Sequence, residues 1–185
     1  MVDDILSDLR QGMDSSINSL KRDLAKRRTG RANVALLDGI KVDYYGTMSP
    51  LNQVASLQVP DPRLIVVKPW EKSMVQPIEK AIQQSPTGLN PSSDGEIVRI
   101  PIPPLTGERR KELIKETKRI GEESKVILRN QRRDANDMLK TLQKDKDISE
   151  DEMHGGMAKV QEITDEFVKK IDELLLAKEK EILED

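Results

Sequence analysis

The chain has 185 residues, of which 35% are charged and 2% are aromatic, and its formal net charge is −2. This length allows one or two domains with a buried core, and the shortage of aromatic side chains argues against a large β-sandwich. Cysteine is absent, which excludes disulfides and cysteine-ligated metal sites. The sequence holds no apolar stretch long enough for a membrane span, and its first residues are acidic where a signal peptide is basic, so we expect a cytoplasmic protein without a membrane partner.

Residues 2–24 predict a first amphipathic helix, because apolar side chains recur at steps of three and four. These side chains are Val2, Leu6, Leu9, Met13, Ile17, Leu20 and Leu24. The pattern ends in a basic run at residues 26–28, and Gly30 is a typical stop or hinge.

Residues 31–104 predict a small α+β domain. All ten prolines lie between Pro50 and Pro104, which prevents long helices in this part of the chain. Short apolar or alternating runs predict four strands, and one apolar repeat predicts a short helix. The strands are expected at residues 40–44, 55–59, 64–67 and 96–100, and the helix at residues 75–82.

A long second helix is predicted from Thr106, a suitable N-cap, to about Lys144. Its apolar and small residues step by threes and fours and indicate a coiled-coil-like seam. The seam residues are Leu113, Thr117, Ile120, Ser124, Ile127, Gln131, Ala135, Met138 and Leu142.

A third helix is predicted to start with a capping box, in which Ser149 is the N-cap and Glu152 is the N3 residue. Its apolar residues are Met157, Val160, Ile163, Phe167, Ile171, Leu174 and Ile182. Gly155 and Gly156 lie inside this helix, and each costs roughly 1 kcal/mol relative to alanine. We therefore expect the helix to start late or to bend there.

Three amphipathic helices can bury their apolar stripes against one another, so residues 1–30 and 105–185 are predicted to form one three-helix bundle. Residues 31–104 are then an insertion between the first and second helices. The predicted fold class is α+β: a long antiparallel three-helix bundle with an inserted, hinged small β/α/β domain. The two chain crossings between the domains can act as a hinge, and the self-contained bundle predicts a monomer.

Charge is segregated along the chain: residues 106–148 carry a net charge of +4, whereas residues 149–185 carry −7. On a helical wheel of ~100° per residue, many bases of the second helix gather on one flank of the seam. They are Lys111, Lys115, Lys118, Lys125, Arg129, Arg132, Arg133 and Lys140. Two interpretations stay open. The flank is either a phosphate-binding surface, which suits the planar fork of arginine, or a solvated face that acids of the third helix partly neutralise.

Signals of catalysis are weak. His154 is the single histidine and is interpreted as an exposed polar residue, and the carboxylates lie at helix-surface spacings. A phosphate-binding glycine loop is also missing from the sequence. We expect a protein that is not an enzyme and has no catalytic residues, cofactor or metal ligands. We also expect Tyr44, Tyr45 and Trp70 to support the core of the small domain rather than to form a stacking platform.

Several motifs resemble those of the bacterial ribosome recycling factor family. They are RTGRA at residues 28–32, LLDGIKVDYYGT at 36–47, LNP at 89–91, PPLTGERRKEL at 103–113, RNQRRDAND at 129–137 and KDKDISEDE at 144–152. The motifs follow one another in order along nearly the whole chain. The resemblance implies a translation factor that binds the post-termination ribosome between its subunits. With elongation factor G and GTP, such a factor splits the ribosome for recycling and hydrolyses nothing itself.

The resemblance also implies site residues. The implied contacts to large-subunit ribosomal RNA are Arg110, Arg129 and Arg132, with Arg28 and Arg133 as additional contacts. The implied hinge consists of Thr29, Gly30, Arg31, Pro103, Pro104 and Leu105. The wheel places Arg110 at the border between the basic flank and the seam. Gly107 departs from the family pattern, which usually has an acid there, and we expect it to weaken the cap of the second helix.

Two other functions stay open at this point. A structural coiled-coil adaptor would bind protein through its charged bundle, and it predicts that Arg132→Ala has little effect on RNA binding. An organellar or ribosome-inhibitory relative would bind the ribosome without splitting it.

Overall fold

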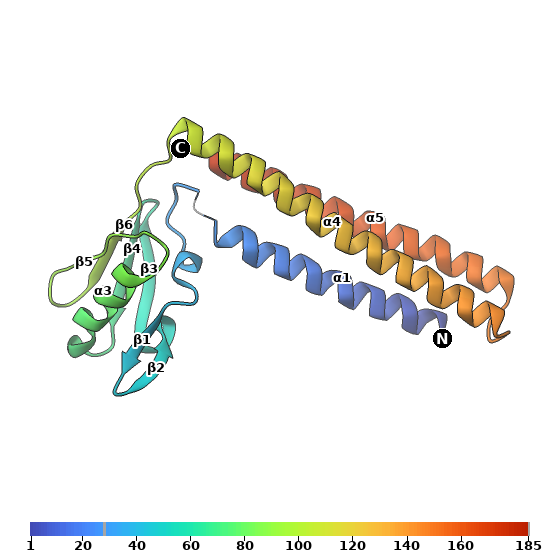
Figure 1. The fold of residues 1–185 in the computed structure, drawn as a ribbon, viewed down its shortest axis with the longest axis horizontal. Helices are drawn as coiled ribbons and strands as arrows, with labels where there is room; N and C mark the ends of the chain where they lie inside the picture. Colours follow the sequence, from blue (N-terminus) through green and yellow to red (C-terminus); the bar gives the residue numbers. More distant parts are fainter. Residues whose placement is uncertain (28, 185) are drawn as a thin grey trace. The chain divides into compact units, whose positions relative to one another are not determined.

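The computed structural model describes residues 1–27 and 29–184. The chain forms two compact units (Figure 1), which we call the helical unit (residues 1–24 and 111–184) and the small unit (residues 25–110). Each unit has its own cluster of buried apolar side chains. The polypeptide therefore builds two separate cores, and the core of the small unit lies within an insertion in the helical sequence.

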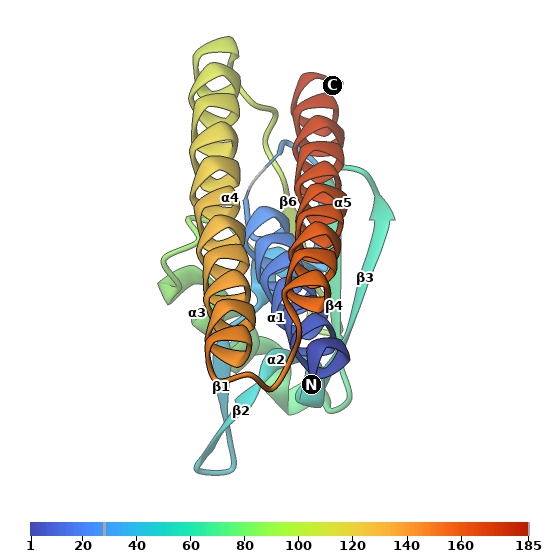
Figure 2. The same ribbon diagram turned by 90° about the vertical axis from the view of Figure 1, so that its right-hand side faces the viewer.

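The helical unit is built on three long helices: α1 (Val2–Ala25), α4 (Gly107–Lys144) and α5 (Glu150–Leu183). Figures 1 and 2 show the three helices side by side, with a short turn joining α4 to an antiparallel α5. Their shared core includes Met13, Leu20, Leu128, Leu139, Phe167 and Ile171. Each such buried side chain stabilises the fold by roughly 1.5–3 kcal/mol. The predicted three-helix bundle is confirmed.

The buried stripe of α4 differs from the predicted seam at two places. Ile127 and Met138 are 49% and 56% exposed, whereas Leu128 and Leu139 are fully buried. Among the buried positions of α4, Gly121, Leu128 and Ala135 recur every seven residues, and Thr117, Leu128 and Leu139 recur every eleven. Both spacings fit an ordinary α-helix of about 3.6 residues per turn. The prediction was wrong for Ile127 and Met138, because their neighbours Leu128 and Leu139 face the core instead.

The helix starts follow the predicted capping. Thr106 accepts a hydrogen bond on Oγ1 from the backbone N–H of Arg109, at 3.2 Å. Ser149 and Glu152 form the complete capping box, and α5 begins directly after it at Glu150. The expected late start of this helix was therefore wrong. Glycine at position 156 lets α4 and α5 approach closely, because a Cβ there would lie only 3.1 Å from the methyl groups of Leu139.

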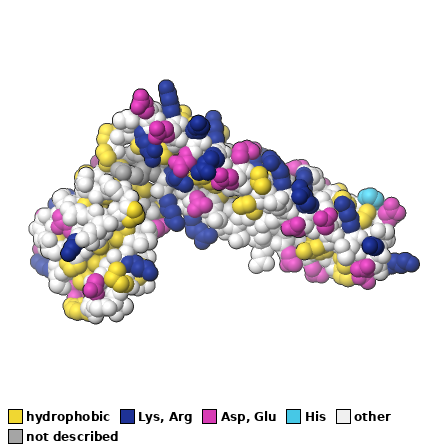
Figure 3. Space-filling view, in the orientation of Figure 1, with side chains coloured by type: hydrophobic (Ala, Val, Ile, Leu, Met, Phe, Trp, Pro, Cys, Tyr) yellow, Lys and Arg dark blue, Asp and Glu magenta, His cyan; other side chains and the backbone are white. Residues whose placement is uncertain are grey.

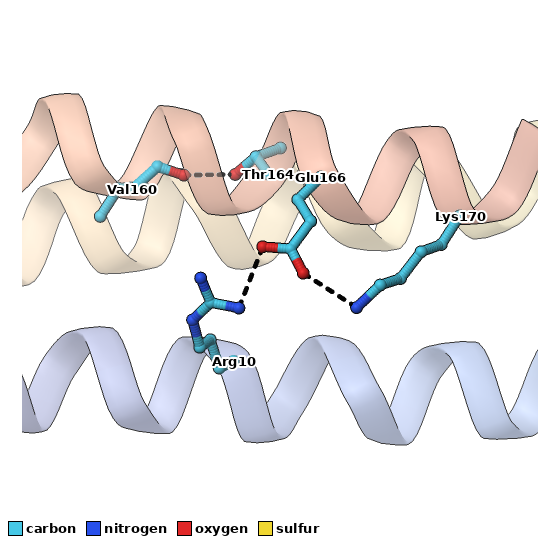
Figure 4. A network of polar contacts seen from close by, with 5 residues as sticks. All are labelled: Arg10, Val160, Thr164, Glu166 and Lys170. Atoms are coloured by element: carbon cyan, nitrogen blue, oxygen red, sulfur yellow. Dashed lines mark hydrogen bonds and ion pairs between the residues drawn. The ribbon is translucent and has the colours of Figure 1, made fainter.

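The side of the bundle formed by α1 and α5 carries a polar network (Figure 4). Arg10 donates a hydrogen bond to Glu166 at 3.0 Å, and Lys170 forms an ion pair with the other carboxylate oxygen at 3.0 Å. On the buried side of α5, the Thr164 hydroxyl donates to the Val160 carbonyl at 2.8 Å, so its polar group is satisfied within the helix. The network adds a charged link between α1 and α5 at the rim of their apolar contact.

The small unit contains a four-stranded antiparallel sheet of order β3-β4-β6-β5 and a separate β1-β2 hairpin. Its strands are β1 (Lys41–Tyr44), β2 (Thr47–Pro50), β3 (Ala55–Asp61), β4 (Leu64–Pro69), β5 (Ser92–Ser93) and β6 (Val98–Pro101). Its helices are η1 (Val34–Leu37), α2 (Leu51–Val54), η2 (Lys72–Met74) and α3 (Val75–Gln84). The predicted strands and the predicted helix are all present. β5 has only two residues and shows no repeat, and β2 (TMSP) lacks the alternating apolar residues that marked the equally short β1.

The core of the small unit is aliphatic. Ile65 of β4 and Ile100 of β6 are fully buried, as are Ile78 and Ile82 of α3. Alternating buried and exposed residues along a strand indicate that one face of the sheet is covered and the other faces water. β6 shows this alternation. α3 therefore covers the sheet and closes an aliphatic core, against which the half-buried Tyr44 packs.

The aromatic residues of the small unit correct our expectation. Trp70 is 68% exposed and Tyr45 is 77% exposed, while Tyr44 is half-buried. Trp70 directly follows β4, and Tyr45 lies in the turn between β1 and β2. The prediction that these side chains support the core is confirmed for Tyr44, which packs against it. It was wrong for the exposed Trp70 and Tyr45, because aliphatic side chains fill that core.

Candidate nucleic-acid interface

Part of the basic flank of α4 is neutralised by α5. Lys118 lies 3.3 Å from Glu179, and Lys125 lies 2.7 Å from Asp172. Lys125 is 17% exposed and also pairs with Glu122 of its own helix at 3.3 Å. The hydrogen bond to Asp172 raises the pKa of Lys125 above its usual value, against the opposing effect of burial. For these two lysines the acid-paired interpretation of the flank is confirmed.

One turn of α4 keeps its positive charge largely available. Arg129, Arg132 and Arg133, which we call the arginine cluster, occupy positions i, i+3 and i+4 of one helix and therefore lie close together. The Arg129 side chain is 54% exposed, and its Nη2 lies 3.8 Å from Oε2 of Glu122, which is a loose ion pair. Arg133 is exposed and forms no hydrogen bond or ion pair with any residue between 1 and 27 or 29 and 184.

Arg132 is positioned by a neutral partner. Its Nη1 donates to the side-chain oxygen of Gln161 on α5 at 3.2 Å, and Gln161 in turn donates to Asp165 at 2.7 Å. The carboxamide orients the guanidinium without cancelling its charge. A guanidinium has five N–H donors, so donors stay available for phosphate oxygens.

Arg110 lies apart from the arginine cluster. It is half-buried at the start of α4, where its backbone N–H donates to the Thr106 carbonyl at 3.0 Å. The nineteen positions from Arg110 to Arg129 correspond to roughly 28 Å along a helix. The structure therefore does not bring the predicted arginines together at one point but spaces them along α4. Arg28, the remaining predicted contact, lies outside the described residues.

The predicted hinge residues lie in two connections whose ends are anchored on the small unit. The backbone N–H of Ala32 donates to the Pro62 carbonyl at 2.6 Å, and that of Ile102 donates to the Arg63 carbonyl at 2.8 Å. Both connections are thus fixed to the same turn between β3 and β4. The segments 29–31 and 103–105 lie between these anchors and the long helices.

Within the first of these segments, Gly30 has a φ of +80°, a conformation that side chains disfavour, and Thr29 is buried. Arg31, Pro103 and Pro104 are exposed, and Leu105 is half-buried. A glycine on one connection and two prolines on the other give the two crossings different stiffness.

Positive and negative side chains alternate on the face of the helices drawn in Figure 3. His154 is exposed and its Nε2 lies 3.6 Å from Glu150, which confirms that it is a surface residue. Among residues 1–27 and 29–184, no three acidic or histidine side chains are placed to hold a metal ion. No helix in that same part of the chain is long and apolar enough to cross a membrane.

Comparison with known proteins identifies the class. The chain is similar to a solution structure of the ribosome recycling factor, with a TM-score of 0.79 and 38% identity over 100% of this chain and 98% of that one. It is also similar, with a TM-score of 0.69 and 48% identity over 99% of both chains, to a T. thermophilus ribosome recycling factor. That protein was described in models with E. coli elongation factor G bound to the E. coli post-termination complex. The fold is that of a translation factor.

The sequences identify the family. The chain is 53% identical over 184 residues to the ribosome-recycling factor of Sorangium cellulosum (strain So ce56), covering 100% of both. It is 55% identical to that of Anaeromyxobacter sp. (strain K), covering 100% of this chain and 98% of the relative. A family model described as Ribosome recycling factor matches residues 20–183. The chain belongs to the ribosome recycling factor family.

Proposed function

We propose that this protein binds the post-termination ribosome in the cytoplasm and, together with elongation factor G and GTP, separates it into subunits. In this proposal the factor itself hydrolyses nothing, and the chemical energy comes from GTP hydrolysis by its partner. Family membership supports the role, and the related T. thermophilus protein was described with elongation factor G on a post-termination complex.

The arginine cluster carries the proposed docking on large-subunit ribosomal RNA. Its three guanidinium groups lie on one helical turn, Arg132 is oriented by a neutral carboxamide, and Arg133 points no donor at a described acid. Planar arginine forks bind phosphate oxygens in pairs, and such contacts position a protein on nucleic acid. Arg110, farther along α4, would supply a second contact, and Arg28 a third.

We further propose that residues 1–30 with 105–185 and residues 31–104 act as two domains joined by a hinge. The hydrogen bonds of Ala32 and Ile102 to the turn between β3 and β4 limit the hinge to the short segments beyond them. Phosphate contacts would hold the bundle, elongation factor G would move the small domain, and the stiff bundle would act as a lever on the contacts between subunits.

The test uses purified post-termination ribosomes, elongation factor G and GTP. We expect the protein to co-sediment with ribosomes at low salt and to convert them to subunits when elongation factor G and GTP are both present. Binding without splitting would indicate an inhibitory relative. Absence of binding would support the adaptor interpretation and would overturn the proposal.

A further inference from the structure

Three of the four aromatic residues of the chain meet at one place in the small unit. The rings of Tyr44 and Tyr45 lie 4.7 Å apart at an interplanar angle of 74°, an edge-to-face contact. Trp70 and Tyr44 line the same small cavity. A chain with so few aromatic side chains exposes two of them here, and exposed aromatic groups mark interaction sites.

A single carboxylate joins the two tyrosines. The Tyr44 hydroxyl donates to Oε1 of Glu71 at 2.6 Å, and the Tyr45 hydroxyl donates to Oε2 at 2.8 Å. Each carboxylate oxygen has a further lone pair, so Glu71 can accept additional hydrogen bonds from a ligand. The two hydrogen bonds, one to each oxygen, hold the carboxylate of Glu71 in place.

The backbone holds Tyr45 in an uncommon conformation. Its φ is +49°, and Gly46 follows with φ +83°, so both central residues of the β1-β2 turn are left-handed. Asparagine, aspartate and glycine are the residues that usually fill such a turn, and a bulky residue there is strained. This strained conformation brings the Tyr45 hydroxyl to Glu71. Core packing does not require it, because the Tyr45 side chain is exposed.

A cavity of about 190 Å³ opens beside this group. Its lining combines two aromatic residues, one acid, two apolar residues and two polar ones: Tyr44, Trp70, Glu71, Val54, Met74, Ser49 and Gln53. A cavity of about 150 Å³ holds one benzene ring, so this one has space for a single planar group. We call it the aromatic–carboxylate pocket.

The charge of the pocket selects the sign of its ligand. The hydrogen bonds from Tyr44 and then Tyr45 lower the pKa of Glu71, so the carboxylate is ionised at neutral pH. Within residues 1–27 and 29–184 Glu71 pairs with no cation, since its partners are the two phenols. The nearby Lys72 is already paired with Glu96 at 2.8 Å. Phosphate is therefore repelled and a cation attracted.

We infer that the aromatic–carboxylate pocket binds an arginine side chain presented by a protein partner. A guanidinium is planar, so it stacks on aromatic rings and can donate two N–H groups to one carboxylate. A lysine ammonium stacks less well and does not match a carboxylate in this paired way. Ser49 and Gln53 offer further acceptors for the remaining N–H groups. Free arginine carries its own carboxylate, which Glu71 would repel, so a segment of protein fits better. This site is separate from α4 and goes beyond the proposed RNA contact.

Trp70 is the single tryptophan of the chain and therefore reports on this pocket directly. The experiment titrates the full-length protein with a capped Gly-Arg-Gly-Arg-Gly peptide and follows tryptophan emission. Parallel titrations use the matching lysine peptide, free arginine and a short oligouridylate. We expect saturable quenching or a shift of emission with the arginine peptide, and weaker binding of the other three probes.

Variants separate the pocket from general charge effects. Glu71→Gln should weaken binding of the arginine peptide by about tenfold or more, because it removes a charged hydrogen-bonding partner. Tyr45→Phe keeps the ring and should weaken binding less. Asp38→Asn removes an exposed carboxylate of the same unit that does not line the pocket, and it should leave binding unchanged. Circular dichroism of each variant establishes that it is folded.

Three results would overturn the inference. The first is an unchanged Trp70 emission with the arginine peptide. The second is equal affinity of folded Glu71→Gln and wild type. The third is tighter binding of free arginine or oligouridylate than of the peptide, which would assign the pocket to a small molecule or to RNA. None of these results bears on the ribosome-splitting assay, so the two proposals fail independently.

Discussion

Arg132 on α4 donates its hydrogen bond to Gln161 on α5, a neutral side chain, across 3.2 Å. Seven residues earlier on the same helix, Lys125 meets the carboxylate of Asp172 at 2.7 Å. The two bases lie on one flank and face the same neighbouring helix, but α5 neutralises one and orients the other. This difference separates bases that hold the bundle together from bases that stay available for a partner.

The first prediction concerns Arg132. Arg132→Gln should weaken ribosome binding by about tenfold or more, because a charged hydrogen bond to phosphate is lost. Each phosphate contact that is lost should reduce the slope of log affinity against log salt by something under ~1 unit. Co-sedimentation at several salt concentrations measures both quantities.

Arg119→Gln is the matched control, since Arg119 is on the same helix and pairs with Glu123 at 3.0 Å. It removes the same charge and should leave the slope nearly unchanged. Equal curves for Arg132→Gln and wild type would remove the arginine cluster from the docking surface and favour the adaptor function.

The second prediction concerns Lys125. Lys125→Gln should lower the melting temperature by a few degrees or less, since partly exposed ion pairs stabilise proteins by roughly 1 kcal/mol at most. The raised pKa means that this stabilisation is fully present below the unfolded-state pKa and is lost as pH rises through the folded-state pKa. Ribosome binding should change little, because the charge is already neutralised. Thermal unfolding and co-sedimentation of one preparation test both parts, and a loss of binding as large as that of Arg132→Gln would contradict the distinction.

The sequence predicts the fold well because its helices are long and its capping and helix-breaking residues are clear. Ser149 and Glu152 specify the start of α5 by local hydrogen bonds alone, and the structure shows that cap. The burial of Leu128 in place of Ile127 depends on how α4 faces α1 and α5. Because Ile127 and Leu128 are both apolar, the sequence is compatible with either one facing the core. Packing between the helices determines which of them is buried.

The candidate site was likewise predictable only in part. Periodicity places Lys118, Lys125 and Arg132 on one flank, and the net charge of −7 after residue 149 indicates that acids could face it. Which base meets an acid depends on the register of α4 against α5, which a single sequence does not encode locally. The pocket at Glu71 also escaped prediction. Tyr44 and Tyr45 precede Glu71 by 27 and 26 positions and meet it only when the β1-β2 hairpin packs within the folded small unit.

The third prediction concerns the pH dependence of the bundle. Hydrogen bonds from Lys170 and then Arg10 lower the pKa of Glu166. A lowered folded-state pKa contributes stability that is present above the unfolded-state pKa and is lost as pH falls through the folded-state pKa. Glu166→Gln should therefore melt at a lower temperature than wild type at neutral pH, and the two should converge in acid. Thermal unfolding across acidic pH measures this, and a difference that is independent of pH would exclude the ionised carboxylate as its cause.

The fourth prediction uses two adjacent glycines of α5. A Cβ at Gly155 would meet nothing within 4 Å, so Gly155→Ala should raise the free energy of unfolding by about 0.5–1 kcal/mol. A Cβ at Gly156 would lie 3.1 Å from Leu139 and 3.2 Å from Val2, so Gly156→Ala should gain less or lose stability. Chemical denaturation compares the two variants. A larger gain at Gly156 than at Gly155 would mean that the contact between helices is looser than the structure describes.

The fifth prediction tests the hinge through its stiffer connection. Replacing Pro103 and Pro104 together by glycine removes two fixed φ angles between the anchor at Ile102 and the start of α4. The arginine cluster is untouched, so salt-dependent ribosome binding should equal that of wild type. Splitting with elongation factor G and GTP should slow, because a loose connection transmits less of the movement of the small domain. The double replacement Pro60→Gly and Pro86→Gly, at two exposed positions within the small unit, controls for proline loss itself. Wild-type splitting by the Pro103 and Pro104 variant would exclude a lever that depends on this connection.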